Sequence, residues 1–164
     1  MNRISVSVIV AAFLLFPGIV HADDVLVGPG KKVSFDYTLT VDKEKVETTI
    51  GKKPLVYNHG RGELIPGLEK ALEGLKVGDA KIVIVKPEDG YGLVRQDAFR
   101  DFDRAKLPKT VDPKVGMVLE MQDESGNAYP AAITEVKDKT VKLNFNHPLA
   151  GKELQFDVKI VSVQ

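Results

Sequence analysis

The chain has 164 residues, a length that fits one domain or one domain with a small insert. Basic and acidic side chains balance at 23 each, so no net charge attracts nucleic acid or an acidic membrane surface, and we expect neither as a partner. With no cysteine and three histidines, the sequence excludes a thiol nucleophile and a disulfide framework and argues against a metal site built from histidine. We therefore expect no cofactor and no metal.

The first 22 residues have the features of a secretory signal peptide. A short polar start with Arg3 precedes an apolar segment over residues 4–20, and Val20-His21-Ala22 offers small residues at a cleavage site. An uncleaved membrane anchor is the alternative, but the segment is short for a bilayer crossing and is interrupted by Pro17-Gly18. We expect cleavage after Ala22, export without stable membrane insertion, and a mobile stretch over residues 23–31.

Alternating apolar residues over 33–41 predict a half-buried strand with one wet face. A charged turn follows at residues 42–45, Val46 begins a return strand, and residues 54–57 form a further short strand. After Pro66-Gly67, the apolar spacing through Leu75 predicts one short amphipathic helix that ends near residues 74–78.

The segment 81–85 is apolar on both faces and is predicted to lie in the middle of a sheet, against the helix. Alternation over residues 154–160 predicts a closing strand. Between them, residues 96–146 have their own turns and apolar alternation, which favours a small, mostly β insert over a structureless loop. Met117 and Met121 would give this insert an adaptable apolar surface, although at strand spacing methionine is more often core.

Tyr91 lies between two glycines in the turn "PEDGYG", directly after the apolar segment. One interpretation is that it caps the strand end and forms a hydrogen bond within its own turn. In the other, its ring and O–H group face a ligand that the glycines allow to approach closely. The spacing leaves both interpretations open.

Two other polar residues are weaker candidates. His59, in a glycine-flanked loop, is interpreted as a surface turn residue. Asp36 is interpreted as a solvated residue or as a hydrogen-bond partner of Tyr91 or of a backbone amide.

Three stretches together resemble the FKBP-type peptidyl-prolyl cis/trans isomerases: "FDYTLTV", "LVYNHGRGELIPGLEKALEGLKVGDAKIVIVKPEDGYG" and "NHPLAGKELQFDVKIV". They are similar more narrowly to the SlyD-like branch, in which a small β domain is inserted in the flap. The resemblance implies an α+β fold with a bent antiparallel sheet wrapped on one short helix. The isomerase domain would comprise residues 23–95 and 147–164, and the inserted flap domain residues 96–146.

The resemblance also implies an apolar proline pocket, and it favours the functional interpretation of Tyr91. Glu47 falls where the family commonly places Asp, and its extra methylene shifts the carboxylate. The expected site residues are Tyr37, Glu47, Leu55, Tyr57, Leu64, Ile65, Leu68, Tyr91, Leu149 and Phe156, with Val46 also at the wall.

Rotation of an X-Pro bond needs no nucleophile or metal, since the barrier of about 18–20 kcal/mol comes from amide resonance. The resemblance therefore predicts an isomerase and folding helper for exported, partly folded polypeptides with X-Pro bonds, acting as a monomer in a bacterial periplasm. Two alternatives stay open: a holdase-type chaperone, and a peptide-binding module with weak or no isomerase activity.

Overall fold

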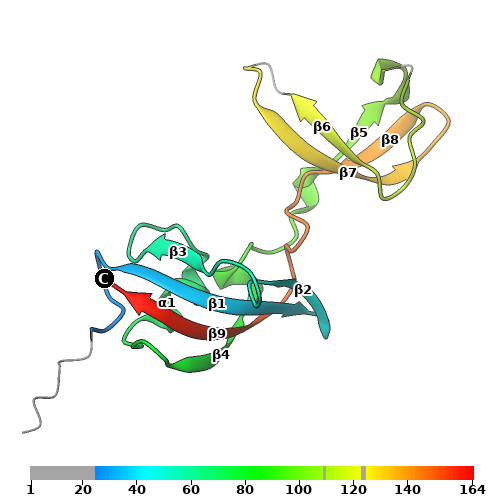
Figure 1. Ribbon diagram of the computed structural model, residues 1–164. Helices are drawn as coiled ribbons and strands as arrows, with labels where there is room; N and C mark the ends of the chain where they lie inside the picture. The colour runs from blue at the N-terminus through cyan, green and yellow to red at the C-terminus, as the bar shows by residue number, and fades with distance from the viewer. Residues whose placement is uncertain (1–24, 109, 123–124) are drawn as a thin grey trace, which may run out of the picture.

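The computed structural model describes residues 25–108, 110–122 and 125–164, and it contains two antiparallel sheets (Figure 1). We call the parts built on these sheets the first and the second lobe. The predicted α+β class is confirmed, and the described residues contain one short α-helix. The predicted signal peptide, residues 1–22, lies outside the described residues, and no helix among the described residues is long and apolar enough to cross a membrane.

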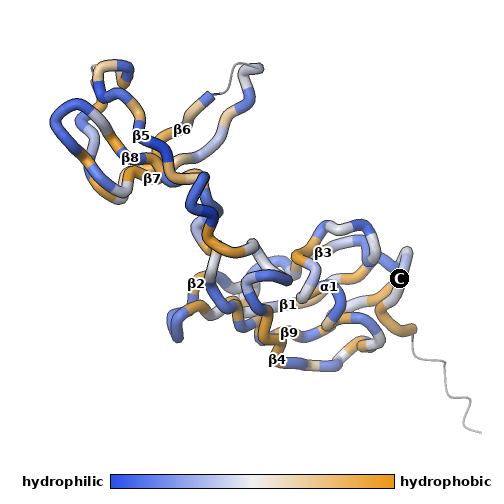
Figure 2. The backbone as a smooth tube through the Cα atoms, turned by 180° about the vertical axis from the view of Figure 1, so that it is seen from behind, coloured by the Kyte–Doolittle hydropathy of each residue, from blue (hydrophilic) through white to orange (hydrophobic). Residues whose placement is uncertain are grey.

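The first lobe holds five strands and the helix. Its elements are β1 (Lys32–Val41), β2 (Glu44–Thr48), β3 (Leu55–Asn58), α1 (Pro66–Leu72), β4 (Ala80–Val85), the 3₁₀ helix η1 (Pro87–Asp89) and β9 (Leu154–Val163). The second lobe holds β5 (Phe99–Asp103), β6 (Val118–Gln122), β7 (Ala128–Val136) and β8 (Thr140–Asn144), with the 3₁₀ helices η2 (Gln96–Ala98) and η3 (Arg104–Lys106). Figures 1 and 2 show two chain segments running between the lobes.

The first sheet is centred on β1 and β9, in the order β2-β1-β9-β4. β3 pairs with the first half of β1 and β2 with the second half, so both lie along the same edge of β1. The predicted alternation is confirmed, because every second residue of β1 from Val33 to Val41 is buried. Register shifts next to Phe35 and Leu39 mark local irregularities of the kind that increase strand bending.

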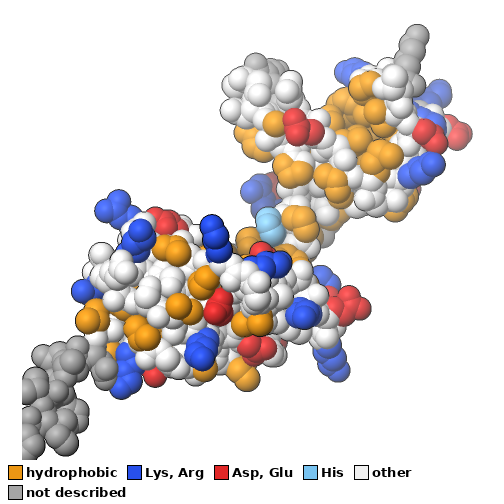
Figure 3. Space-filling view, in the orientation of Figure 1, with side chains coloured by type: hydrophobic (Ala, Val, Ile, Leu, Met, Phe, Trp, Pro, Cys, Tyr) orange, Lys and Arg blue, Asp and Glu red, His pale blue; other side chains and the backbone are white. Residues whose placement is uncertain are grey.

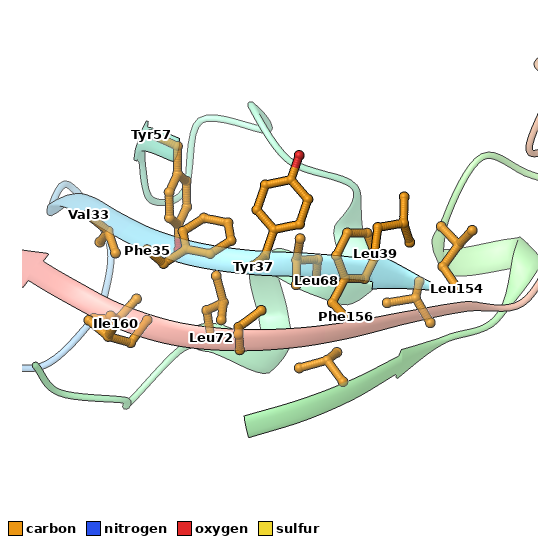
Figure 4. Packing of buried hydrophobic residues seen from close by; sticks show 14 of the residues in the cluster. Val33, Phe35, Tyr37, Leu39, Tyr57, Leu68, Leu72, Leu154, Phe156 and Ile160 are labelled. Atoms are coloured by element: carbon orange, nitrogen blue, oxygen red, sulfur yellow. The ribbon is translucent and has the colours of Figure 1, made fainter. Parts of the chain in front are cut away.

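Helix α1 packs Leu68 and Leu72 against this sheet (Figure 4). Pro66 occupies the first turn, where its missing N–H costs no helical hydrogen bond. Gly67 allows the close approach of the helix, since a Cβ there would lie 2.7 Å from Val85 Cγ1. Seven residues are too few for a stable isolated helix, so the contact with the sheet stabilises it.

Two sequence predictions are wrong in this lobe. β4 lies at the edge of the sheet rather than in its middle, and the Ile82 side chain is 65% exposed while Val83 and Val85 are buried. The second wrong prediction is the mobile stretch over residues 23–31, because its described part, residues 25–31, is attached to the lobe. Val27 is 2% exposed, its N–H donates to the Leu75 carbonyl at 2.7 Å, and its own carbonyl accepts from Gly74 at 2.8 Å.

The second sheet has the order β5-β8-β7-β6. The hairpin predicted around residues 125–127 joins β6 to β7, with Met121 opposite Tyr129. β5 was not predicted, because "FRDFD" lacks a period of two; it forms through pairing with β8. The strands of this sheet fall between residues 99 and 144, and the division of the chain into domains at 96–146 stays a prediction.

Each lobe has its own hydrophobic cluster. The first cluster draws its buried members from β1, β3, β4 and β9, from α1 and from Val27. The second is formed by Ala131, Ile133, Val141 and Leu143, with partly buried side chains around them. The two clusters share no residue, so each sheet packs on a core of its own.

Candidate functional site

A cavity of about 490 Å³ opens in the first lobe between the sheet and the start of α1. β1, β9 and α1 supply most of its apolar wall, and the turn after η1 supplies Tyr91. The lining residues are Phe35, Tyr37, Leu39, Glu47, Leu55, Gly62, Glu63, Leu64, Ile65, Pro66, Leu68, Tyr91 and Phe156. This lining has no Ser, Cys, Lys or His side chain, and it suits an apolar ligand better than covalent chemistry.

Tyr37 lines the cavity from the face of β1 that also carries Phe35 and Leu39 (Figure 4). Its ring centroid is 5.9 Å from that of Phe156 and 5.8 Å from that of Phe35, both in tilted arrangements. Its backbone N–H donates to Thr49 Oγ1 at 2.9 Å, and its carbonyl accepts from the Thr49 N–H at 3.0 Å. These contacts hold the ring in a fixed place at the junction of β1 and the end of β2.

The Tyr37 hydroxyl is kept protonated. Burial raises the pKa of Tyr37 to about 12, and the adjacent Glu47 carboxylate adds to the rise through its hydrogen bond and its negative charge, followed by Tyr91. Glu47 therefore faces Tyr37 within the cavity, although it replaces the expected Asp. The pair offers a ligand a neutral phenol next to a carboxylate.

Glu63 brings a second carboxylate to the cavity mouth. The Asn58 backbone N–H and side-chain amide both donate to it at 3.0 Å. These hydrogen bonds lower the pKa of Glu63 below its usual value. The cavity therefore combines apolar walls with two acidic side chains, Glu47 beside Tyr37 and Glu63 at the mouth.

Tyr91 is 39% exposed and contributes its ring to the cavity wall. Within the part of the chain that the structure describes, no hydrogen bond engages its hydroxyl, so the bond to its own turn, which the first of the two interpretations required, is not formed there. The His147 ring stacks on it, with centroids 3.8 Å apart and planes 5° apart. The side-chain partner of Asp36 is Thr49, whose Oγ1 donates to the Asp36 carboxylate at 3.0 Å, and not Tyr91 or a backbone amide.

Most of the residues expected at the site lie around this cavity. They are Tyr37, Glu47, Leu55, Leu64, Ile65, Leu68, Tyr91 and Phe156. Tyr57 and Leu149 do not line it: Tyr57 is buried behind Phe35, and Leu149 packs against the cluster from the loop before β9. Val46 is 54% exposed on β2 and also lies outside the lining.

His59 is a buried residue and not a surface turn residue. It is 5% exposed, and its Nδ1 lies 3.0 Å from the Tyr57 hydroxyl. Burial, followed by the charge of Glu69, raises the pKa of Tyr57 to about 12. The glycine-rich loop folds this histidine inward because its ring completes the hydrogen bonding of the buried phenol.

Sequence reasoning missed five lining residues: Phe35, Leu39, Gly62, Glu63 and Pro66. Phe35 and Leu39 share the inward face of β1 with Tyr37, so the period of two could have identified them. Gly62 and Glu63 lie in an irregular loop where no periodicity indicates direction.

The second lobe has a separate hollow of about 440 Å³. It is lined by Arg100, Asp101, Phe102, Met121, Gln122, Tyr129, Leu143 and Phe145. Hydrophobic side chains gather on the face of this lobe shown in Figure 3. Met121 is partly buried and packs against the cluster, so it serves both the core and the hollow.

Comparison with known proteins agrees with the geometry of the cavity. Residues 24–161 match the family of FKBP-type peptidyl-prolyl cis-trans isomerases. The chain is 35% identical over 154 residues to a short-type peptidyl-prolyl cis-trans isomerase of Methanocaldococcus jannaschii, with 85% of this chain and 95% of the relative covered. It is 37% identical over 139 residues to the isomerase SlyD of Aeromonas hydrophila, with 84% and 65% covered. A probable 16 kDa FKBP-type isomerase of Pseudomonas fluorescens is 31% identical over 139 residues, with 84% and 92% covered. The chain therefore belongs to the FKBP-type peptidyl-prolyl cis-trans isomerase family and is similar to its SlyD branch, as its motifs predicted.

Proposed function

We propose that the first-lobe cavity binds the proline ring of an X-Pro segment and accelerates rotation of its peptide bond. The observation that carries this proposal is the apolar cavity built by Tyr37, Leu68 and Phe156, with the Tyr91 ring at its edge. A family member of this kind acts on polypeptides that contain proline. The ten residues expected at the site are proposed as its functional set, eight of them in the lining and Tyr57 and Leu149 in supporting positions.

The mechanism uses preferential binding of the twisted amide. In the planar ground state, resonance separates charge between the amide nitrogen and oxygen, and water stabilises that form. An apolar wall removes this water and so raises the free energy of the planar amide. The twisted amide has no charge-separated resonance form, so removal of water raises its free energy less. If desolvation and orientation together lower the barrier by about 6 kcal/mol, the rate rises about 10⁴-fold.

Two phenols orient the substrate in this proposal. The Tyr91 hydroxyl, which no described residue engages, donates to a substrate carbonyl next to the proline and fixes its register. The Tyr37 hydroxyl, whose pKa is about 12, stays neutral at physiological pH, so the cavity wall gains no negative charge from ionisation. Neither tyrosine transfers a proton.

The second lobe serves as the site that holds partly folded chains. Phe102, Met121, Tyr129 and Phe145 give its hollow an apolar, adaptable lining. A chain held there stays near the cavity, which raises the local concentration of its prolines. We infer that the protein is exported through the signal peptide at residues 1–22, and that it acts in a bacterial periplasm as a monomeric folding helper.

A protease-coupled peptide assay on residues 23–164 tests the isomerase function. We expect acceleration of cis-to-trans conversion of an X-Pro peptide in proportion to enzyme concentration. The holdase alternative, favoured by the second-lobe hollow, predicts suppression of aggregation of an unrelated unfolded protein with no acceleration in the peptide assay. N-terminal sequencing of exported protein tests cleavage after Ala22, and recovery of the full-length chain in a membrane would contradict export.

A further inference from the structure

Tyr91 needs support, because it forms part of the cavity wall from a turn. It lies two residues after the end of η1, and the residue is 39% exposed. Tyr91 lines the first-lobe cavity and also a second hollow at the base of the two connecting segments. Tyr91 therefore borders two open spaces, and a neighbouring group that packs on its ring would fix the orientation of that ring.

His147 is the group in contact with that ring. Its imidazole lies parallel to the Tyr91 phenol, with planes 5° apart and centroids 3.8 Å apart, which is van der Waals contact. His147 lines the second hollow but not the cavity. It therefore covers the phenol from the side away from the cavity, and it is not itself part of the cavity wall.

The loop after His147 fixes the imidazole in turn. The Leu149 N–H donates to His147 Nδ1 at 3.1 Å, which requires Nδ1 to be unprotonated and assigns the ring proton to Nε2. The Ala150 N–H donates to the His147 carbonyl at 2.9 Å. The Gly151 N–H donates to the Gly92 carbonyl at 2.8 Å, next to Tyr91. The two rings are thus joined both by their stack and by their backbones.

The residue before His147 is also held. The Asn146 side chain accepts from the Arg95 N–H at 2.8 Å and donates to the Arg95 carbonyl at 3.0 Å. It thus forms the same two hydrogen bonds with Arg95 as the backbone of a paired strand would form. The loop that carries the imidazole is therefore tied, both before and after His147, to the segment that follows Tyr91. Such a double attachment suits a residue whose role is to orient another.

We propose that His147 is a positioning residue for the isomerase reaction, which holds the Tyr91 phenol at the cavity edge by stacking on its outer face. The inference rests on the proposed role of Tyr91 in binding the substrate. His147 makes no contact with substrate and needs no change in its charge. Its contribution is to keep the phenol in the orientation that faces the substrate carbonyl.

Two substitutions distinguish the contribution of the His147 ring from that of its hydrogen bond to the Leu149 N–H. His147→Asn keeps a side-chain acceptor for the Leu149 N–H but removes the ring, whereas His147→Phe keeps a ring for stacking but removes the acceptor. We expect His147→Asn to lower kcat/KM for a short X-Pro peptide about three- to tenfold, the scale of one aromatic pair. We expect His147→Phe to retain most of the activity. In a Tyr91→Ala background, His147→Asn should cause no further loss, because the group that it positions is absent.

The ring protons of Tyr91 supply a direct readout by NMR. A stacked ring shifts them upfield, so His147→Asn should move them downfield while His147→Phe should not. Thermal unfolding of each variant on the same samples shows whether folding is retained.

If the wild-type protein is an active isomerase and His147→Asn has the same kcat/KM as the wild type, the role proposed for His147 is wrong. An equal loss in the presence and absence of Tyr91 would overturn it as well, because the effect would then come from the loop. A wild-type chain that does not accelerate isomerisation would contradict the isomerase function itself, and this inference would fall with it.

Discussion

The two lobes differ in how their apolar residues are used. Among the residues that the structure describes, the first lobe buries fifteen hydrophobic residues in one cluster around β1, β9 and α1, and its cavity opens within that cluster. The second lobe buries four, and side chains such as Phe102 and Met121 stay partly exposed around its hollow. A rigid cluster suits a site that must favour one twisted geometry, whereas a thin core with exposed apolar side chains suits loose binding of varied chains.

The largest expected effect concerns the independence of the two cores. Leu72→Ala in the first lobe should destabilise that lobe by about 2–5 kcal/mol, because it leaves a cavity in a fully buried site. Ile133→Ala, at an equally buried site, should loosen the second lobe and leave the first intact. Urea unfolding followed by amide hydrogen exchange reads the two lobes separately. One common transition, shifted equally by both substitutions, would show that the lobes fold as a single unit.

A smaller effect is expected at the cavity edge. Tyr91→Phe removes one hydroxyl and should reduce kcat/KM. The loss of transition-state stabilisation should be about 0.5–1.5 kcal/mol, the range of a single hydrogen bond. Tyr91→Ala also removes the wall and should cost more. Neither substitution should unfold the chain, since Tyr91 lies on a turn and is 39% exposed. Full isomerase activity in Tyr91→Phe, combined with loss of folding in Tyr91→Ala, would assign Tyr91 to packing.

The smallest effect is expected in alkaline solution. Burial raises the pKa of both Tyr37 and Tyr57 from 10.0 to about 12, so the folded state favours the neutral phenols. Their contribution to stability is complete below pH 10 and is lost as the pH rises from about 10 through about 12. Thermal melts are recorded across this pH range. The melting temperature should fall less steeply with pH for Tyr37→Phe than for Tyr129→Phe, a control at an exposed tyrosine. Identical slopes in the two variants would exclude a contribution from Tyr37.

Much of the first lobe was predictable because its strands and helix each bury one face. The period of two in β1 indicated that Tyr37 points inward, and the spacing of Leu68 and Leu72 gave the helix its buried side. β4 was placed wrongly because an apolar run has the same appearance in a central strand and at an edge. What decides its place is that β9 and not β4 pairs with β1, a long-range choice that local sequence does not contain.

The site was predictable where it depended on motifs and less so where it depended on loops. Glu63 and Gly62 reach the cavity only through the path of the loop between β3 and α1. His59 turned out to be buried because Tyr57 offers it a hydrogen bond, and no spacing in the sequence indicates that contact. The His147–Tyr91 stack joins residues 56 positions apart and likewise depends on the tertiary fold.

The central claim, that the first lobe isomerises while the second lobe holds the chain, is tested most directly by replacing residues 96–146 with a short loop. The first cluster contains no residue from this range, so the remaining chain is expected to fold. Two rates are compared with those of the wild-type protein: isomerisation of a short X-Pro peptide, and proline-limited refolding of a protein substrate. We predict that peptide isomerisation partly survives while catalysis of refolding falls at least about tenfold, as loss of tethering implies. Equal losses in both assays would contradict the division of labour between the two lobes.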